Sequence, residues 1–562
     1  MLLQDNKYKE RLPEETVEVI KNFFASLGSD FRLELRAEKD TKVGFFWHRL
    51  FLYYKDMLVV DTTGKGATRN LSMASAYAEM YERFCCLYLS GIEAKDHIPF
   101  GADERELTNE EALLPFLKIK EAERNNVAEY MRLLYGGLWG VPFKNICGGE
   151  DMDIDLNCLG TIFGSNGMAA GNTLKEALNQ GISEVFERYI HFVAYYGGKK
   201  FKLISEEVIN GEAPEIYEKI KLLEQYDISV KVYDASFDTG LPVLCALLLD
   251  KNRMQHCFSF GAFPVFEIAL ERTLSEALQG KLFIEDLQMT PCTPFEGATD
   301  NYNIMGGYGG VILPETVFVE AETVHEVNKA VYLPKDSDND RIFEHIQSIL
   351  SEKSLDGYYR DMSLSEEVKT VWVCIPELEK GFDISYVGGS KESLLKVDNL
   401  LSDIKEQRMN KENLHSKVSL MEAFDLQQHS YLALQLFYTG LYSSISEYIE
   451  GIILLAEGDW VNTPNFIIGI SEHFLKEKKL LSELQVLVNF YTRLNKTTQS
   501  EIKKRISLWN LQDDYEKLSD PAFMLEKYLY KPLFGKRAME RKQNQREIRG
   551  KISNMRCANE SN

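Results

Sequence analysis

The sequence lacks the features of secreted and membrane-bound proteins. Its N-terminus has no apolar signal region, and no stretch approaches the ~18 apolar residues that cross a bilayer. Its nine cysteines are scattered, odd in number and free of C-x-x-C pairs, which disfavours both a disulfide framework and a local iron–sulfur loop. These absences predict a protein of the reducing cytoplasm, with no membrane as a partner.

Basic residues are also fewer than acidic residues. The chain has 64 basic against 86 acidic residues and a net charge of −22, which disfavours nonspecific binding to nucleic acid. Basic protein partners remain possible. With 562 residues, of which 44% are hydrophobic, the chain can bury a large core and is expected to hold two or three domains.

Two common catalytic devices are missing as well. The P-loop pattern G-x-x-x-x-G-K-[ST] does not occur, and the nine histidines are dispersed, so each is interpreted as structural. Residues 61–70 contain Gly64 and Gly66 ahead of a predicted helix. Such a turn can offer backbone N–H groups to an anion, although an ordinary connecting turn is the alternative.

In place of these devices, the sequence has three rows of carboxylates at helical spacing. Residues three, four or seven apart share one helix face. The rows are Ser75, Glu79 and Glu82; then Glu176, Gln180, Glu184 and Glu187; then Arg272, Glu276 and Gln279. A solvated acidic face explains any single row, because like charges at i, i+4 repel by only about 0.2–0.5 kcal/mol. Three rows that also carry Ser, Gln or Arg favour a site for Mg²⁺ and phosphate, since carboxylates suit the ion and guanidinium groups suit phosphate.

The first two rows look like copies of one unit. Both contain E-x-x-E-R, beginning at Glu79 and at Glu184, and a glycine, Gly66 or Gly171, stands equally far ahead of each. Two copies of a supersecondary unit would place their acidic helices face to face, although E-x-x-E-R also arises by chance. The arginine of each motif follows its glutamate by one residue, so we expect it to point partly away and to brace the helix.

The remaining pattern predicts an α+β core followed by an all-α region. A helix is expected at 13–27, and strands at 43–47, 50–54, 58–60, between 228 and 260, and at 371–375. We divide the chain into a helical N-terminal segment that contributes to the core (1–45), the main domain (46–385), a linker (386–414) and a helical domain (415–562). The last of these has no strict 34-residue repeat but resembles tetratricopeptide helix pairs, and its basic end, 536–551, is expected to fray.

With these motifs, the chain resembles the YcaO family, and within it the stand-alone bacterial members. The similarity lies in the run T-x-G-K-G-A-T into S-x-x-x-E-x-x-E-R, in A-G-N-T-L-x-E-A-x-x-Q-G-x-S-E-V-F-E-R and in R-x-x-x-E-A-L-Q. It covers the first 385 residues strongly. The resemblance implies an α+β ATP-binding domain that binds ATP and Mg²⁺ in a site unrelated to P-loops.

The family motifs also imply a role for individual residues of this chain. The metal ligands would be Glu79, Glu82, Glu184 and Glu276. The ATP-binding residues would be Lys9, Thr16, Ser75, Asn172, Gln180 and Arg272, with Arg272 on a phosphate. Thr16 stands where a family relative has serine seven residues after the lysine, which preserves the hydroxyl.

The chemistry implied by the family is ATP-dependent phosphorylation of an amide or carboxyl group. Stand-alone members are associated with β-methylthiolation of an aspartate of ribosomal protein S12, as accessory factors to a radical SAM methylthiotransferase. This chain lacks the three-cysteine loop of the radical enzyme itself. The protein substrate, the methylthiotransferase and a second copy of the chain are therefore the expected partners.

Two other functions stay open. In one, the protein is a non-catalytic docking partner whose nucleotide site is regulatory. In the other, it forms thioamides or azolines in peptides. The second is disfavoured because the chain ends in R-C-A-N-E-S-N rather than in a proline-rich tail, and because few residues precede the core for a leader-binding domain.

Overall fold

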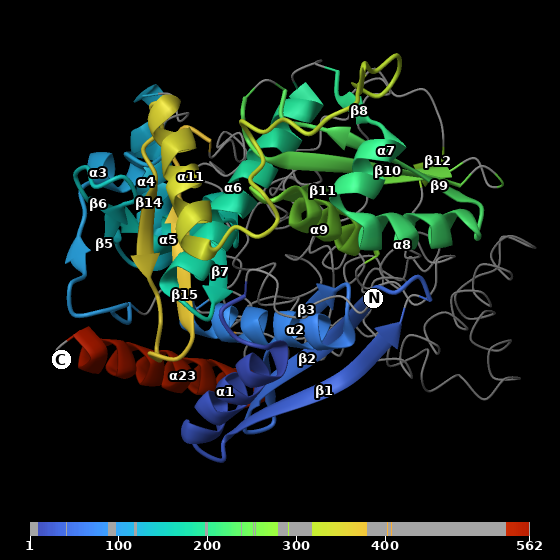
Figure 1. The fold of residues 1–562 in the computed structure, drawn as a ribbon. Coiled ribbons are helices and arrows are strands. Elements are labelled where there is room, and N and C mark those ends of the chain that lie inside the picture. Colours follow the sequence, from blue (N-terminus) through green and yellow to red (C-terminus); the bar gives the residue numbers. More distant parts are fainter. Residues whose placement is uncertain are drawn as a thin grey trace, which may run out of the picture.

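Three β-sheets with helices packed on them make up the described part of the chain (Figure 1). A computed structural model describes residues 9–40, 42–87, 97–116, 121–196, 200–237, 239–250, 252, 255–278, 290–291, 317–378, 402, 406 and 536–560. The mixture of helices and sheets confirms the α+β prediction for the main domain. Within the described ranges, no helix has the length and apolar character needed to span a bilayer.

The first sheet is antiparallel, has the strand order β1-β2-β3, and is covered by two helices. The elements are α1 (Pro13–Ser26), β1 (Phe31–Asp40), β2 (Phe46–Tyr54), β3 (Met57–Gly66) and α2 (Arg69–Cys85). The helix predicted at 13–27 and the strands predicted between 43 and 60 are confirmed. The sequence pattern does not predict β1, so the N-terminal segment 1–45 contains a strand as well as a helix.

The second sheet has the order β4-β5-β14-β15-β7, with β6 paired to β5. Its strands are β4 (Arg105–Glu106), β5 (Trp139–Asn145), β6 (Met152–Asp155), β7 (Met168–Gly171), β14 (Tyr358–Asp361) and β15 (Lys369–Cys374). The helices α3 (Asn109–Leu113), α4 (Glu121–Tyr135) and α5 (Leu156–Phe163) belong to the same stretch of chain. Two segments about 200 residues apart therefore pair in one sheet, and β15 confirms the strand predicted at 371–375.

The third sheet has the order β12-β11-β10-β9-β8-β13. Its strands are β8 (Lys202–Ile204), β9 (Ile228–Asp234), β10 (Val243–Asp250), β11 (Gln255–Ala262), β12 (Thr290–Pro291) and β13 (Thr323–Val324). The accompanying helices are α6 (Leu174–Tyr196), α7 (Glu206–Glu212), α8 (Pro214–Glu224), α9 (Phe266–Leu278) and α11 (Asn339–Glu352). The strands predicted between 228 and 260 are confirmed.

The two similar sequence motifs form similar structural units. Strand β3 leads into α2, and strand β7 leads into α6. A Cβ added to Gly66 would lie 2.7 Å from the backbone nitrogen of Ser72, and one added to Gly171 would lie 2.5 Å from that of Ala177. Each glycine thus lets its strand approach the helix six residues later, which is the structural counterpart of the internal repeat.

The structure corrects the interpretation of the glycine-containing stretch before α2. Residues up to Gly66 belong to β3 and pair with β2, where Phe46 lies opposite Gly66. The helix then begins at Arg69. The preceding residue, Thr68, caps it, because its side chain accepts a hydrogen bond from the backbone N–H of Leu71. The glycines therefore lie in a strand that packs closely on the helix, instead of forming a turn.

The basic C-terminal end does not fray as predicted. It forms α23 (Lys536–Glu560; Figure 1), which contacts β3 and buries Ile548 and Ile552 in the same core as α1 and α2. The rest of the predicted tetratricopeptide-like domain, 415–535, and most of the predicted linker lie outside the described residues.

Candidate functional site

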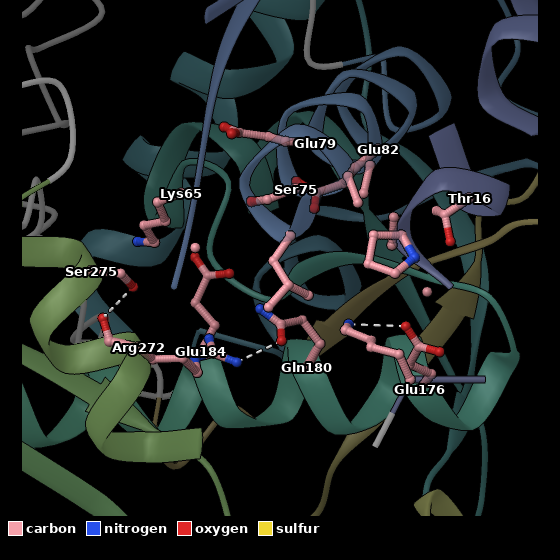
Figure 2. A pocket seen from close by; sticks show the side chains of 18 of the residues that line it. Thr16, Lys65, Ser75, Glu79, Glu82, Glu176, Gln180, Glu184, Arg272 and Ser275 are labelled. Atoms are coloured by element: carbon pink, nitrogen blue, oxygen red, sulfur yellow. Dashed lines mark hydrogen bonds and ion pairs between the residues drawn. The ribbon is translucent and has the colours of Figure 1, made fainter. Parts of the chain in front are cut away.

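The three acidic rows lie on α2, α6 and α9, and these helices line one cavity of about 340 Å³ (Figure 2). Every residue predicted to bind ATP or metal lines this cavity: Lys9, Thr16, Ser75, Glu79, Glu82, Asn172, Gln180, Glu184, Arg272 and Glu276. Three segments that are distant in sequence thus present their polar faces to a common space. Helices α2 and α6 face it together, as the internal repeat predicts.

The N-terminal segment lies against one end of the cavity. The hydroxyl of Thr16 donates to Oδ1 of Asn172 at 2.8 Å, and Nδ2 of Asn172 donates to Oε2 of Glu176 at 3.1 Å. The ammonium of Lys9 is 2.9 Å from Oε1 of Glu176, whose residue exposure is only 1%. Lys9 thereby neutralises a buried carboxylate that belongs to the second acidic row.

The arginine of the first E-x-x-E-R motif holds both glutamates of its row. Nη2 of Arg83 lies 3.2 Å from Oε1 of Glu79, and Nη1 lies 3.0 Å from Oε1 of Glu82. Arg188, its counterpart on α6, lines the cavity too. The two arginines therefore face the site instead of pointing away from it, although Arg83 does brace its row as expected.

Burial makes two carboxylates of the cavity, Glu82 and Glu184, expensive to ionise. Desolvation raises the pKa of Glu82 well above its usual value, Arg83 opposes this rise, and Glu79 and Glu184 add to it. Desolvation likewise raises the pKa of Glu184, with Arg188 and Arg83 opposing the rise. A divalent cation among these groups would favour their ionised forms.

The donor set fits a magnesium–nucleotide complex. Carboxylate oxygens suit Mg²⁺, while the guanidinium of Arg272, which donates to Oε1 of Gln180 at 2.5 Å, suits phosphate. In the described ranges, no three carboxylate, imidazole or thiol side chains already converge on one point. Mg²⁺ needs only one or two protein carboxylates when water and phosphate oxygens complete its shell.

Several lining residues were not assigned a role from the sequence. Lys65 forms an ion pair with Glu276, and burial lowers the pKa of Lys65 to about 8, against the opposing charge of Glu187. Oε2 of Glu187 accepts from the backbone N–H of Ala262 at 3.2 Å. Two sequence signals could have identified these residues. Lys65 stands between two glycines, and Glu187 is the second glutamate of E-x-x-E-R.

This combination of carboxylates with lysine and arginine, built without a P-loop, fits a metal-dependent nucleotide-binding site. The family model described as YcaO cyclodehydratase, ATP- and Mg²⁺-binding, matches residues 63–379, which is more than half of the chain. The chain belongs to the YcaO family, and its cofactors are ATP and Mg²⁺. The resemblance deduced from the motifs is confirmed, as is the cofactor prediction.

Two curated relatives are similar over part of their length. The ribosomal protein S12 methylthiotransferase accessory factor YcaO of Escherichia coli is 33% identical over 267 residues, 42% of this chain and 44% of the relative. An uncharacterized protein of Haemophilus influenzae is 32% identical over 254 residues, 40% of this chain and 42% of the relative. The alignments thus span less than half of each relative.

Two solved structures are also similar. One is a heterocyclase in complex with substrate and cofactor, 18% identical with a TM-score of 0.47, covering 67% of this chain and 54% of that one. The other is YcaO from Methanopyrus kandleri bound with AMPPCP and Mg²⁺, 18% identical with a TM-score of 0.45, covering 66% of this chain and 93% of that one. The family assignment rests on the family model and not on these structures.

Proposed function

We propose that the protein uses ATP and Mg²⁺ to activate an amide or carboxyl group of a protein substrate by phosphorylation, as an accessory factor in β-methylthiolation of an aspartate of ribosomal protein S12. The observation that carries the first part is the single cavity shared by the three acidic helices. The second part is supported by the name of the Escherichia coli relative.

The proposed roles of the residues follow from their chemistry. Glu79, Glu82, Glu184 and Glu276 would hold the metal, and Arg272 would bind a phosphate. Lys9, Thr16, Ser75, Asn172 and Gln180 would hold and orient the nucleotide. ATP supplies a phosphoryl group that turns a carbonyl oxygen into a leaving group, and positioning together with charge neutralisation gives most of the acceleration in such transfers.

Phosphate release by the purified full chain tests the enzymatic part. We expect Mg²⁺-dependent release of phosphate from ATP that increases when the protein substrate is added. A chain that binds ATP with Mg²⁺ but releases no phosphate under any of these conditions would instead be the non-catalytic docking partner. Mass spectrometry of ribosomal proteins from a deletion strain tests the pathway, because the methylthio group on the S12 aspartate should be lost.

We also propose that residues 415–535 form helix pairs that dock the methylthiotransferase or a second copy of the chain, with a cap over the core as the alternative. Because α23 packs on the core, simple truncation would remove core residues. Replacing 415–535 with a flexible Gly/Ser linker keeps α23. A monomer that still binds ATP supports docking. If the linker variant keeps the oligomeric state and the partner binding of the wild type, residues 415–535 act only as a cap over the core.

A further inference from the structure

Lys65 lies at the edge of the cavity, where the end of β3 faces α9 (Figure 2). It stands between Gly64 and Gly66, and a Cβ added to either glycine would collide with the backbone of α2. Side chains alternate across a strand, so the two glycines put this part of β3 directly on α2, and the residue between them extends to the opposite side. There its ammonium pairs with Glu276 of α9.

The other cations of the cavity with recorded partners are engaged differently. Arg83 bridges Glu79 and Glu82 of its own helix, and Lys9 neutralises Glu176 beneath the N-terminal segment. Arg83 therefore also pairs with assigned metal ligands, but it bridges two of them on its own helix, whereas Lys65 pairs with a single one, Glu276 of α9. The ammonium of Lys65 is a compact charge on a flexible four-carbon stem, which can move several ångströms without any backbone change.

A carboxylate oxygen that is held by an ammonium group is unavailable to a metal ion. Two cations on one carboxylate would also repel each other. Binding of a divalent cation to that oxygen, or to both oxygens of Glu276, therefore requires Lys65 to leave. A nearby phosphate would compensate the released ammonium, because lysine commonly binds phosphate as a point charge.

We propose that Lys65 is an exchangeable counter-ion of this site. It pairs with Glu276 in the ligand-free protein, yields that carboxylate to the divalent cation, and then binds a phosphate of the nucleotide. The inference rests on the proposed function of the cavity. It assigns Lys65 opposite effects on two ligands: competition with the metal and attraction of the nucleotide.

The experiment measures those two ligands separately at constant pH on the full-length protein. Binding of Mn²⁺ without nucleotide is followed by electron paramagnetic resonance, and binding of ATP in the presence of EDTA is followed by calorimetry. In Lys65→Met, we expect Mn²⁺ to bind about tenfold more tightly and ATP about tenfold more weakly. The matched control is Lys175→Met. Lys175 lies on the exposed side of α6 and pairs with Asp340 of α11, so its replacement should change neither affinity.

A second variant keeps the test decisive if Lys65→Met does not fold. Glu276→Gln removes the acceptor of the ion pair, so Mn²⁺ should bind more weakly while ATP without metal binds at least as tightly as in the wild type. Loss or retention of both affinities together, in either variant, would overturn the counter-ion role. Absence of ATP and Mn²⁺ binding in the wild type would overturn the proposed function itself.

Discussion

The guanidinium of Arg556 donates to the carbonyl oxygen of Cys85 at 2.6 Å and to that of Phe100 at 2.9 Å. Cys85 is the last residue of α2, and Arg556 is only 3% exposed. A cation at a helix C-terminus satisfies carbonyl groups that have no partner within the helix and complements the helix dipole. The last described helix of the chain therefore stabilises the helix that carries Glu79 and Glu82.

Replacing Arg556 with alanine should destabilise the protein. The change would leave two buried carbonyl groups without their hydrogen-bond donor. Each unsatisfied group costs about 1–3 kcal/mol of folding free energy. Chemical denaturation of the full chain should show a lower midpoint. Lys536→Ala, on the same helix with a side chain that is 90% exposed, is the control and should leave the midpoint unchanged. Equal midpoints for both variants would show that α23 does not support α2.

Replacing Glu79 or Glu184 with glutamine should abolish Mg²⁺-dependent ATP binding without unfolding the protein. Glutamine keeps the shape of the side chain and removes the charge that a hard cation requires. Because burial raises the pKa of Glu184, loss of its charge should not lower the melting temperature. Calorimetry with ATP and Mg²⁺ measures the effect, and the exposed Glu344→Gln is the control. Unchanged affinity in both cavity variants would contradict the metal assignment.

Arg272→Lys should weaken ATP binding by about tenfold or more, since hydrogen bonds to charged groups contribute about 1.5–3 kcal/mol. Lysine keeps the charge but cannot hold Gln180 and a phosphate with one planar group. The apparent KM for ATP is the simplest readout. Arg341→Lys on the exposed start of α11 should leave it unchanged. A normal KM in Arg272→Lys would indicate that charge alone suffices.

The hydroxyl of Thr16 should matter more than its methyl group. Thr16→Val keeps the volume but removes the donor to Asn172, whereas Thr16→Ser keeps the hydroxyl. We expect the valine variant to bind ATP several-fold more weakly and the serine variant to behave as the wild type, measured by calorimetry. Deletion of residues 1–17 should raise the KM for ATP. An unchanged KM for ATP after that deletion would show that Lys9 and Thr16 do not contribute to ATP binding.

The stability of the protein should depend on pH through Glu104. Burial raises the pKa of this carboxyl to about 7, and its partner His97, 3.0 Å away, has a pKa that burial lowers. The folded state then binds the proton more tightly than the unfolded state, so stability falls as pH rises from about 4.5 to 7. Glu104→Gln should be more stable than the wild type at pH 8 and equal to it at pH 4.5, by denaturation at both values. A constant difference between the two proteins would contradict the shift.

Much of the fold and most of the candidate site could be predicted because their signals are local. The spacing of Ser75, Glu79 and Glu82 places them on one face of any helix, and α2 has that face in the cavity. The same holds for Gln180 and Glu184 on α6. The β-strand periodicity between 228 and 260 likewise suffices to predict three strands of one sheet.

The order of the strands within each sheet could not be predicted in the same way. Pairing of β14 with β5 joins residues more than 200 positions apart, and no local pattern specifies which strands become neighbours. The glycines beside Lys65 gave a false signal of a turn, because a glycine can serve either a turn or a close contact between backbones. Only the packing of β3 on α2 distinguishes the two.

The sequence by itself determined the helical spacing of the acidic rows, and with it the choice of carboxylates that share a face. Tertiary structure alone decided that Lys65 pairs with Glu276, that Lys9 neutralises Glu176, and that Arg556 closes the end of α2. Helical spacing follows from bonds between residues a few positions apart. Each of the three contacts joins residues more than 160 positions apart, so it forms only when the burial of apolar surface has brought distant segments together.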